Sequence, residues 1–291
     1  MKNIRFKHFI PLLAGTSLGF ILGWWGFILI FTWIGGWITI GILISSQKKG
    51  KAKDTGRRIS ILMIALVLLC FLGFIQHENL QIEETVFYTL LFITSGIFTR
   101  VLIHYAIAKI FGPFIFGRGF CGWACWTAAL MEWLPVKENR SIPIKYTRIR
   151  YLVLVVSILI PIIFILLGYD WVSNHVYTAG KNSRPGALIW FLTGNCIYYI
   201  AATWLAFKFR KKRAFCKIVC PVSLVMKAQT SIALLRKKPS GNACISCKVC
   251  NINCPMDVDV MRYISAGKKV SSSECISCGI CVDVCPQKAI H

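Results

Sequence analysis

Two cysteine runs near the end of the chain restrict its possible folds more than any other feature. The runs Cys244–Pro255 and Cys275–Pro286 both read C-x2-C-x2-C-x3-C-P. Three thiolates separated by two residues each can hold one corner of an iron–sulfur cube, but the chain between them cannot close around the far iron. The fourth thiolate of each cube must therefore come from another part of the chain.

This segment is similar to bacterial-type ferredoxins with two clusters, in which each run holds one [4Fe–4S] cube and the runs exchange their last cysteine. The proline after each exchanged cysteine stops further helix there. The predicted ligands are Cys244, Cys247, Cys250 and Cys285 for one cluster, and Cys275, Cys278, Cys281 and Cys254 for the other.

Other cysteine-rich sites fit the pattern less well. Zinc ribbons use two C-x2-C pairs rather than two runs of four with a trailing proline. A disulfide framework is typical of small secreted domains, whereas this chain has 291 residues and long apolar runs. Two [4Fe–4S] clusters favour a reducing, cytoplasmic location for the segment and a role in carrying single electrons.

The first 210 residues contain apolar runs that are typical of membrane spans. The chain is 56% hydrophobic and only 15% charged, compared with about 25% charged residues in soluble domains. The net charge of +23 does not indicate a nucleic-acid partner, because the basic residues lie between apolar runs, where they set topology. We therefore expect a multi-pass protein of the cytoplasmic membrane, in contact with lipid.

The fold class expected is an α-helical membrane protein with about six transmembrane helices and a small α+β ferredoxin domain at its C-terminal end. Both chain ends are predicted to be cytoplasmic, because the basic segments, beginning with Lys2 and Arg5, then all lie inside. The outer loops are then 76–84 and 169–186. The expected helices are about 9–23, 26–46, 58–75, 85–110, 151–168 and 187–207.

Three parts of the chain follow from this organisation. Residues 1–57 form an N-terminal transmembrane hairpin, residues 58–236 a duplicated membrane domain, and residues 237–291 the ferredoxin domain. In the hairpin, Gly15, Gly19 and Gly23 recur every four residues. They either allow close helix contact or reflect the general abundance of glycine in membrane helices. Residues 222–236 predict an amphipathic helix at the membrane interface.

A second cysteine pattern occurs twice. Residues 118–131 read Arg-x-Phe-Cys-x3-Cys-x5-Met, and residues 213–226 repeat these residues at a constant offset of 95. Each copy follows a helix that is predicted to return to the cytoplasm, so the membrane domain is expected to contain a duplicated unit. The four cysteines of the repeat are Cys121, Cys125, Cys216 and Cys220.

The residues leave the role of these four cysteines open. Two C-x3-C pairs could together bind one metal, since thiolates suit zinc or iron–sulfur. They could also form redox-active dithiols or remain buried thiols, because C-x3-C is not a common spacing for zinc or for clusters. Cys70 and Cys196 lie in apolar helices and are expected to be packing residues.

The paired Arg-x-Phe-Cys-x3-Cys units, followed by a two-cluster ferredoxin, resemble the NapH-type membrane ferredoxins, which are related to the NosR and CcoG proteins. The resemblance covers residues 85–291 and rests on the segments 117–125 and 215–221. Trp126 stands where that family usually has proline, and the N-terminal hairpin goes beyond its four-helix plan. The resemblance implies quinol oxidation, or electron handling at the membrane for a reductase.

Arg100 and His104 lie inside an expected span, where charged groups usually face a cavity, a partner or a substrate. A histidine can exchange protons with a quinol near neutral pH, and an arginine can stabilise an anionic intermediate. These residues are therefore candidates for a quinone site. Alternatively, Arg100 extends to the inner headgroups, or His77 and His175 border an outer quinone site.

The function that these patterns favour is a quinol-linked electron-transfer subunit that passes single electrons between the quinone pool and iron–sulfur or cytochrome partners. The alternative is an electron donor for metal or cofactor maturation, as the relationship to CcoG implies, with the C-x3-C pairs as its reactive end. A redox sensor is a third hypothesis. No P-loop occurs in the sequence, and its one G-x-G-x-x-G string, at Gly117, Gly119 and Gly122, lies inside the cysteine repeat rather than after a strand, which argues against nucleotide chemistry.

Overall fold

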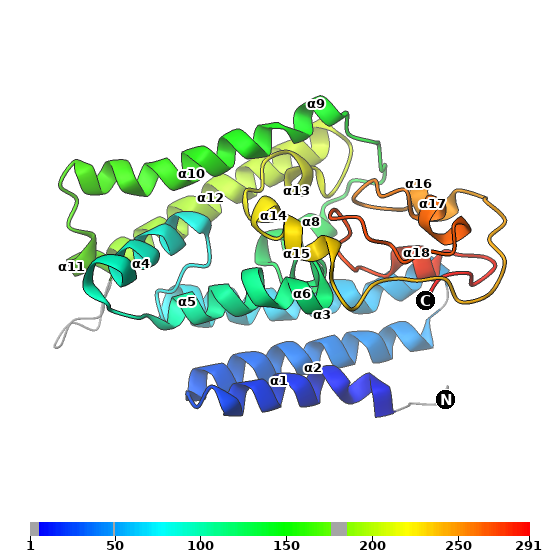
Figure 1. The fold of residues 1–291 in the computed structure, drawn as a ribbon, viewed down its shortest axis with the longest axis horizontal. Coiled ribbons are helices and arrows are strands. Elements are labelled where there is room, and N and C mark those ends of the chain that lie inside the picture. Colours follow the sequence, from blue (N-terminus) through cyan, green and yellow to red (C-terminus); the bar gives the residue numbers. More distant parts are fainter. Residues whose placement is uncertain (1–5, 49, 176–184) are drawn as a thin grey trace.

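The computed structural model describes residues 6–48, 50–175 and 185–291 (Figure 1). The long helices run along the longest axis of the molecule, and residues 237–291 lie at one end of them (Figure 1). In the described part of the chain, four helical segments are long and apolar enough to cross a membrane. They are α2 (Trp25–Gln47), α3 with the π-helical η3 (Asp54–Ile75), α9 with α10 (Ile144–Leu166), and α12 (Pro185–Lys208).

These four helices make the chain a multi-pass membrane protein, as the apolar runs predicted. The predicted spans 26–46, 58–75, 151–168 and 187–207 correspond to them. The first predicted span does not, because α1 (Ile10–Ile21) has only 12 residues. At a rise of 1.5 Å per residue it covers about 18 Å, which is short of the ~30 Å hydrocarbon core.

Helix α1 instead packs along α2 as an N-terminal hairpin (Figure 1). A β-carbon on Gly15 would lie 2.3 Å from the Phe31 carbonyl oxygen, and one on Gly19 would lie 2.7 Å from the Ile28 Cα. These two glycines therefore permit the close helix contact that the sequence suggested. Gly23 has φ +71° and forms the turn of the hairpin instead.

The predicted span 85–110 is wrong as a single helix. Helix α4 (Ile82–Ser95) ends at Gly96, whose φ of +66° is the left-handed conformation of a helix C-cap. The chain then continues through α5 (Arg100–Tyr105), the π-helical η4 (Ala106–Phe111) and α6 (Gly112–Phe116). Helices α4 and α5 contact each other. Apolar composition alone did not reveal this interruption.

Most of the predicted outer loop 76–84 is buried inside the protein rather than exposed. Glu78, Asn79, Leu80 and Gln81 are each at most 5% exposed. Non-helical backbone at membrane depth is tolerated where it is buried in protein. The acidic and amide groups find partners there: for example, the Asn79 Oδ1 accepts a hydrogen bond from the Gln81 amide at 3.0 Å.

Helices α10 and α12 supply further partners for this inward segment. The Glu83 Oε1 accepts hydrogen bonds from the Ser157 hydroxyl at 2.6 Å and from the Tyr198 hydroxyl at 3.3 Å. Residues of the second predicted outer loop from 176 to 184 lie outside the described residues, as do Lys2 and Arg5. Cys70 and Cys196 are exposed on their helices rather than packed inside, which corrects the packing role expected for them.

Short helices at one end of the long helices carry both copies of the repeat and the ferredoxin tail (Figure 1). The predicted helix 222–236 is shorter than expected: helix ends at Ser231, and the Leu234 and Leu235 amides donate to the carbonyls of Phe114 and Ile115. The short helices at this end are α7 (Gly119–Trp123), α8 (Trp126–Trp133), α13 (Ala214–Ile218), α14 (Val222–Val225), α15 (Lys227–Ser231), α16 (Val249–Ile252), α17 (Val260–Ser265) and α18 (Ile280–Asp283), whereas α11 (Trp171–His175) lies at the opposite end (Figure 1).

The β component of the expected α+β tail is small. In residues 237–291 the β pairing consists of one antiparallel bridge, between Pro239 and Ile290. The Lys238 and His291 amides each donate to the other's carbonyl at 2.9 Å. The two ends of the tail are thereby joined, so the cysteine runs between them fold into one unit.

Candidate iron–sulfur sites

Two cavities in the tail are each lined by four cysteines. We call them the distal and the proximal cavity, because the proximal one adjoins the membrane domain. Each cavity combines three cysteines of one run with the last cysteine of the other, the arrangement that the spacing predicts. The distal cavity is lined by Cys244, Cys247, Cys250 and Cys285, and the proximal cavity by Cys254, Cys275, Cys278 and Cys281.

The backbone of the two runs has the same local conformation. Ser246 and Ser277 occupy equivalent positions and both have φ +54°. At Lys248 and Gly279, two residues later, φ is again positive, and a single helical turn follows in each run. These turns wrap the chain around each cavity, so that all three cysteines of a run line its wall.

The exchanged cysteines also have equivalent surroundings. The Val258 amide lies 3.3 Å from the Cys254 sulfur, and the Ala289 amide lies 3.3 Å from the Cys285 sulfur, both as hydrogen-bond donors. Hydrogen bonds to ligand sulfurs are among the factors that set the potential of iron–sulfur clusters. The two cavities are therefore suited to clusters of similar type.

A third four-cysteine cavity lies in the membrane domain, where the two copies of the repeat meet. All four repeat cysteines, Cys121, Cys125, Cys216 and Cys220, line it. We call these residues the quartet. The space that protein atoms leave free at the quartet, including the part open to solvent, is about 600 Å³, compared with about 360 Å³ at each of the two tail cavities. It is therefore large enough for a group of the size that the tail cavities hold.

The two halves of the quartet have matching backbone geometry. The amide of Cys125 donates to the Phe120 carbonyl at 2.9 Å, and the amide of Cys220 donates to the Phe215 carbonyl at 3.0 Å. In both copies the first cysteine lies on a five-residue helix, α7 or α13, and the second lies two residues after the end of that helix. The repeat found in the sequence is thus a repeat in structure as well.

The arrangement favours a cluster over a single metal ion. Sulfurs bound to one tetrahedral zinc lie about 3.8 Å apart, given a Zn–S distance of about 2.3 Å. Among the described residues, no three His, Cys, Asp or Glu side chains approach closely enough to hold one ion. The same is true of the tail cavities, whose cysteines have the sequence spacing of [4Fe–4S] ligands, so the quartet resembles them in this respect.

A redox-active dithiol is not favoured either. Cys121 and Cys216 are buried, and reactive thiols need exposure and a lowered pKa. Burial raises the pKa of the Cys216 thiol to about 11, although the neighbouring Arg213 acts in the opposite direction. A thiol with such a pKa is protonated at neutral pH unless a metal centre binds and deprotonates it.

Buried cations surround the quartet. Lys109 and Arg118 line its cavity and are 5% and 1% exposed. Arg213, which is fully buried, donates from Nη1 to the Cys121 carbonyl at 2.9 Å. A [4Fe–4S] cluster with four thiolate ligands carries net negative charge, and buried charges need compensating partners. The positive surroundings therefore fit the residues of the quartet to such a cluster.

The quartet directly contacts the proximal cysteine run. A β-carbon on Gly122 would lie 2.2 Å from the Ile276 carbonyl oxygen. The Trp123 indole N–H donates to the Ser277 carbonyl at 3.2 Å, and the Ser277 hydroxyl donates to the Phe116 carbonyl at 3.3 Å. The loop that carries half of the quartet therefore packs against the loop between Cys275 and Cys278.

Ion pairs hold the tail in this position. Glu274, next to Cys275, pairs with Arg118 at 2.8 Å and with Arg150 at 2.7 Å. Burial alone would raise the pKa of Glu274, but the hydrogen bond from Arg150 and the charge of Arg118 lower it to about 2. The carboxylate therefore stays ionised at neutral pH. Sequence reasoning missed these partners, because Arg118 and Glu274 are 156 residues apart.

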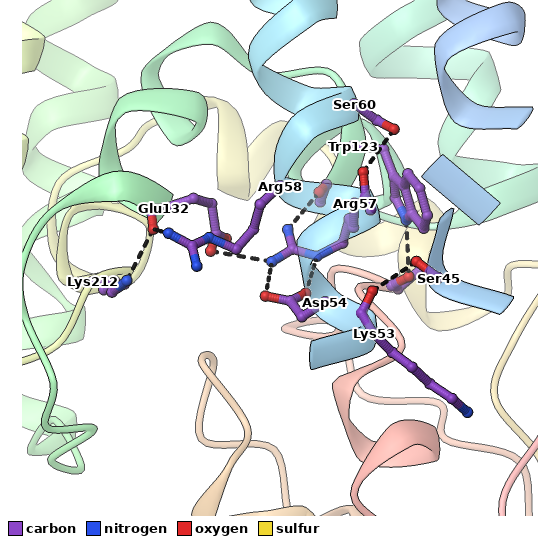
Figure 2. A network of polar contacts seen from close by, with 12 residues as sticks. Ser45, Lys53, Asp54, Arg57, Arg58, Ser60, Trp123, Glu132 and Lys212 are labelled. Atoms are coloured by element: carbon purple, nitrogen blue, oxygen red, sulfur yellow. Dashed lines mark hydrogen bonds and ion pairs between the residues drawn. The ribbon is translucent and has the colours of Figure 1, made fainter. Parts of the chain in front are cut away.

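A second ion-pair network stabilises the quartet from the other side (Figure 2). Arg57 pairs with Asp54 at 2.7 Å and with Glu132 at 3.1 Å, and its Nη1 donates to the Gly122 carbonyl at 2.9 Å. Glu132 also accepts a hydrogen bond from the Nε of Arg213 at 2.9 Å. The two arginines thus hold backbone carbonyls of the same cysteine loop.

The predicted quinone residues lie elsewhere, beside the N-terminal hairpin. The His104 Nδ1 lies 3.0 Å from the Glu78 Oε2, and both residues are at most 4% exposed. The Arg100 guanidinium lies over the Trp24 ring, 4.2 Å from its centroid. Arg100 and His104 therefore face the same aromatic ring, since Trp24 also contacts His104. The side chain of His175 lies outside the described residues.

Comparison with known families finds 4Fe-4S-binding domains at both kinds of site. A family described as "4Fe-4S dicluster domain" matches residues 236–286. A second family, described as "4Fe-4S binding domain", matches residues 102–143 and again residues 197–239, so each copy of the repeat is matched. No solved structure matches the chain.

Two uncharacterized proteins of Methanocaldococcus jannaschii are similar to the chain. One is 24% identical over 204 residues, which is 63% of this chain and 76% of the relative. The other is 24% identical over 205 residues, or 66% of this chain and 75% of the relative. The chain thus carries 4Fe-4S ferredoxin-type domains beside long apolar helices, and it is an iron–sulfur electron-transfer protein of the membrane whose clusters are bound by cysteine motifs.

Proposed function

We propose that the protein carries single electrons along a row of three [4Fe–4S] clusters, one at the quartet, one in the proximal cavity and one in the distal cavity. The observation that carries this proposal is the contact between Gly122 and the Ile276 carbonyl. It joins the quartet loop to the proximal cysteine run. The exchange of Cys254 and Cys285 joins the proximal cavity to the distal one in turn.

The row has a direction in space, from the membrane domain to the far side of the tail. Helix α13, which carries Cys216 of the quartet, lies at one end of α10 and α12, and the tail extends beyond it (Figure 1). We infer that this end faces the cytoplasm, where a reducing environment maintains thiolate ligands and where the basic segments belong. Electrons that enter at the membrane domain then leave at the tail, or the reverse.

Counting iron tests the row. Three clusters require about twelve iron atoms per chain in anaerobically purified protein, with matching acid-labile sulfide. Cys121→Ser should reduce this to about eight and remove one EPR signal of the reduced protein. The matched control is Cys70→Ser, since Cys70 is exposed on a long helix. A wild-type protein with only two clusters, unchanged by Cys121→Ser, would refute the row and leave a two-cluster ferredoxin.

Quinol is our proposed electron donor, as the resemblance to NapH-type membrane ferredoxins implies. The supporting observation is the buried pair of His104 and Glu78, because quinol oxidation needs groups that accept protons. Purified protein should be reduced by a menaquinol analogue, and His104→Gln should slow this reduction while dithionite still reduces the clusters. If the menaquinol analogue reduced the clusters of wild type and variant at equal rates, His104 would not be the proton acceptor in quinol oxidation.

The rival proposal, electron donation for maturation of another enzyme, shares the same clusters but needs accessible C-x3-C thiols. The burial of Cys121 and Cys216 favours cluster ligands at these positions instead. Alkylation of the folded anaerobic protein distinguishes the two. Cluster ligands should resist a thiol reagent until iron is chelated, whereas a reactive dithiol should be modified at once.

A further inference from the structure

The carboxylates of the tail are unevenly distributed between its two faces. Residues 237–291, all of which the structure describes, contain four acidic residues. Three of them pair with cations of the membrane domain: Asp257 with Lys211 at 2.6 Å, Glu274 with Arg118, and Asp283 with Lys53 at 3.5 Å. The negative charge of the tail is therefore largely neutralised on the side that faces the membrane domain.

The cations of the tail remain on its outer surface. The fourth acidic residue, Asp259, is exposed, but its carboxylate caps α17 and accepts a hydrogen bond from Asn251. On the exposed surface of the tail, basic side chains therefore outnumber acidic ones by six to one. Its exposed basic residues are Lys238, Lys248, Arg262, Lys268, Lys269 and Lys288.

The distal cysteine set opens onto this positive surface. Cys247 is exposed, whereas the cysteines of the proximal set are at least partly buried. Ile245, 57% exposed, and Lys248 both line the distal cavity and reach solvent. An exposed apolar residue beside an electron-transfer centre, with a lysine in the lining of the same cavity and an excess of exposed basic residues on the same domain, is the pattern of a docking surface for a partner of opposite charge.

We propose that this face docks an acidic, soluble one-electron carrier protein of the flavodoxin or ferredoxin class, which exchanges electrons with the distal cluster. The inference rests on the proposed row of clusters and names its partner. One electron leaves the reduced carrier and arrives on the oxidised distal cluster, or passes in the opposite direction, and no bond forms or breaks. Opposite charges raise the rate of encounter and orient the carrier.

Anionic lipid is the competing occupant, since juxtamembrane basic residues also attract lipid headgroups. The position of the face argues for a protein. It includes residues beside the distal cysteine set, whose lining comes entirely from the tail, whereas the proximal run packs against Gly122 and Trp123 of the membrane domain. A group of basic residues that served only to anchor the tail on lipid would not need an exposed cysteine at this face.

The test measures electron transfer from flavodoxin hydroquinone to the full-length protein in nanodiscs of neutral phosphatidylcholine. Formation of the blue semiquinone in a stopped-flow instrument reports the transfer of one electron. We expect the second-order rate constant to fall as salt is added. The basic carrier cytochrome c, used as an acceptor from the prereduced protein, should show the opposite salt dependence.

Charge reversal locates the face. Lys248→Glu with Lys288→Glu should lower the second-order rate constant of electron transfer from flavodoxin at least tenfold at low salt. The difference from wild type should disappear at high salt. The matched control is Lys145→Glu with Arg148→Glu, an equal change at two exposed positions of the membrane domain, which should have little effect. If Lys248→Glu perturbs the distal cluster, Lys268→Glu with Lys269→Glu, beyond α17 and outside the cavity lining, supplies the test.

The outcomes separate this inference from the proposed function. One outcome is that dithionite reduces the clusters, but the rate of reduction by flavodoxin depends neither on salt nor on charge reversal. That result would overturn the docking face and leave the row of clusters intact. An effect of the variants that requires anionic lipid in the nanodisc would assign the face to the membrane instead. Missing clusters in the wild-type protein, counted by iron and EPR, would remove the row itself.

Discussion

Gly122 and Ile276 approach so closely that a β-carbon at position 122 would lie 2.2 Å from the Ile276 carbonyl oxygen. The two residues belong to different cysteine loops, one in the membrane domain and one in the tail. Backbone atoms cannot move aside as a flexible side chain can, so only glycine fits. This contact sets how near the quartet and the proximal cavity lie.

Gly122→Ala should separate the two loops. We expect a loss of about 1–3 kcal/mol of stability from overpacking, together with slower electron transfer from the quartet cluster to the tail after photoreduction. The control is Gly36→Ala, because a β-carbon there would have its nearest neighbour 3.9 Å away. Equal transfer rates in Gly122→Ala and wild type would mean that this contact does not set the cluster separation.

Glu132→Gln should be strongly destabilising. It removes the carboxylate that pairs with Arg57 and Arg213, both at most 1% exposed, and an uncompensated buried charge costs about 3–5 kcal/mol. Thermal unfolding in detergent measures the effect. Glu138→Gln is the control, since Glu138 pairs with Arg140 and Arg210 on the exposed surface, and its loss should leave the melting temperature unchanged. Similar melting temperatures for both variants would contradict the role of the buried network.

The attachment of the tail should not depend on pH between 5.5 and 8. The pKa of Glu274 is lowered from 4.5 to about 2 by its arginine partners. Its stabilisation is therefore fully present above about pH 4.5 and is lost only as the pH falls from there towards 2. After correction for intrinsic rates, hydrogen exchange of the amides at positions 275–278 should show equal protection at both pH values.

Glu274→Gln should reduce that protection at every pH, because a hydrogen-bonded charge contributes about 1.5–3 kcal/mol. Asp259→Asn serves as the comparison, since Asp259 lies on the outer side of the tail and has no partner in the membrane domain among the ion pairs described. Protection that changed in Asp259→Asn but not in Glu274→Gln would argue against Glu274 as the tether.

The exchange of cysteines between the two runs predicts a pattern of iron loss. Cys285→Ser should lose about four iron atoms, and adding Cys244→Ser should lose no more, because both residues line the distal cavity. Adding Cys275→Ser to Cys285→Ser should instead remove both tail clusters. The opposite pattern of additivity would mean that each run keeps its own fourth cysteine.

Some features of the site could be read from residue type and spacing. The two tail runs predict their cysteine sets, and the cavities combine the same residues. The offset of 95 residues predicts the duplicated unit, whose backbone hydrogen bonds match in the two copies. Patterns of this kind are readable from the sequence because the conformation of a short loop depends mostly on its own residues.

Other features depend on contacts that spacing does not encode. The segment around Glu78 has the composition of an outer loop, yet it is buried because His104, Ser157 and Tyr198 offer polar partners to its acidic residues. The span 85–110 is apolar throughout its centre but is broken at Gly96. Hydropathy measures the preference of a segment for lipid and does not reveal which part of the protein it packs against.

The sequence by itself determined the two cysteine runs of the tail, the repeated cysteine pair and the long apolar helices, because residue type and local spacing define candidate ligands and membrane spans. Only the tertiary structure decided how these parts connect. It brings Trp123 to Ser277 across 154 residues, and it turns three acidic residues of the tail inward against cations of the membrane domain. Such pairings depend on complementary shape and charge between distant segments, which emerge only when the whole chain has folded.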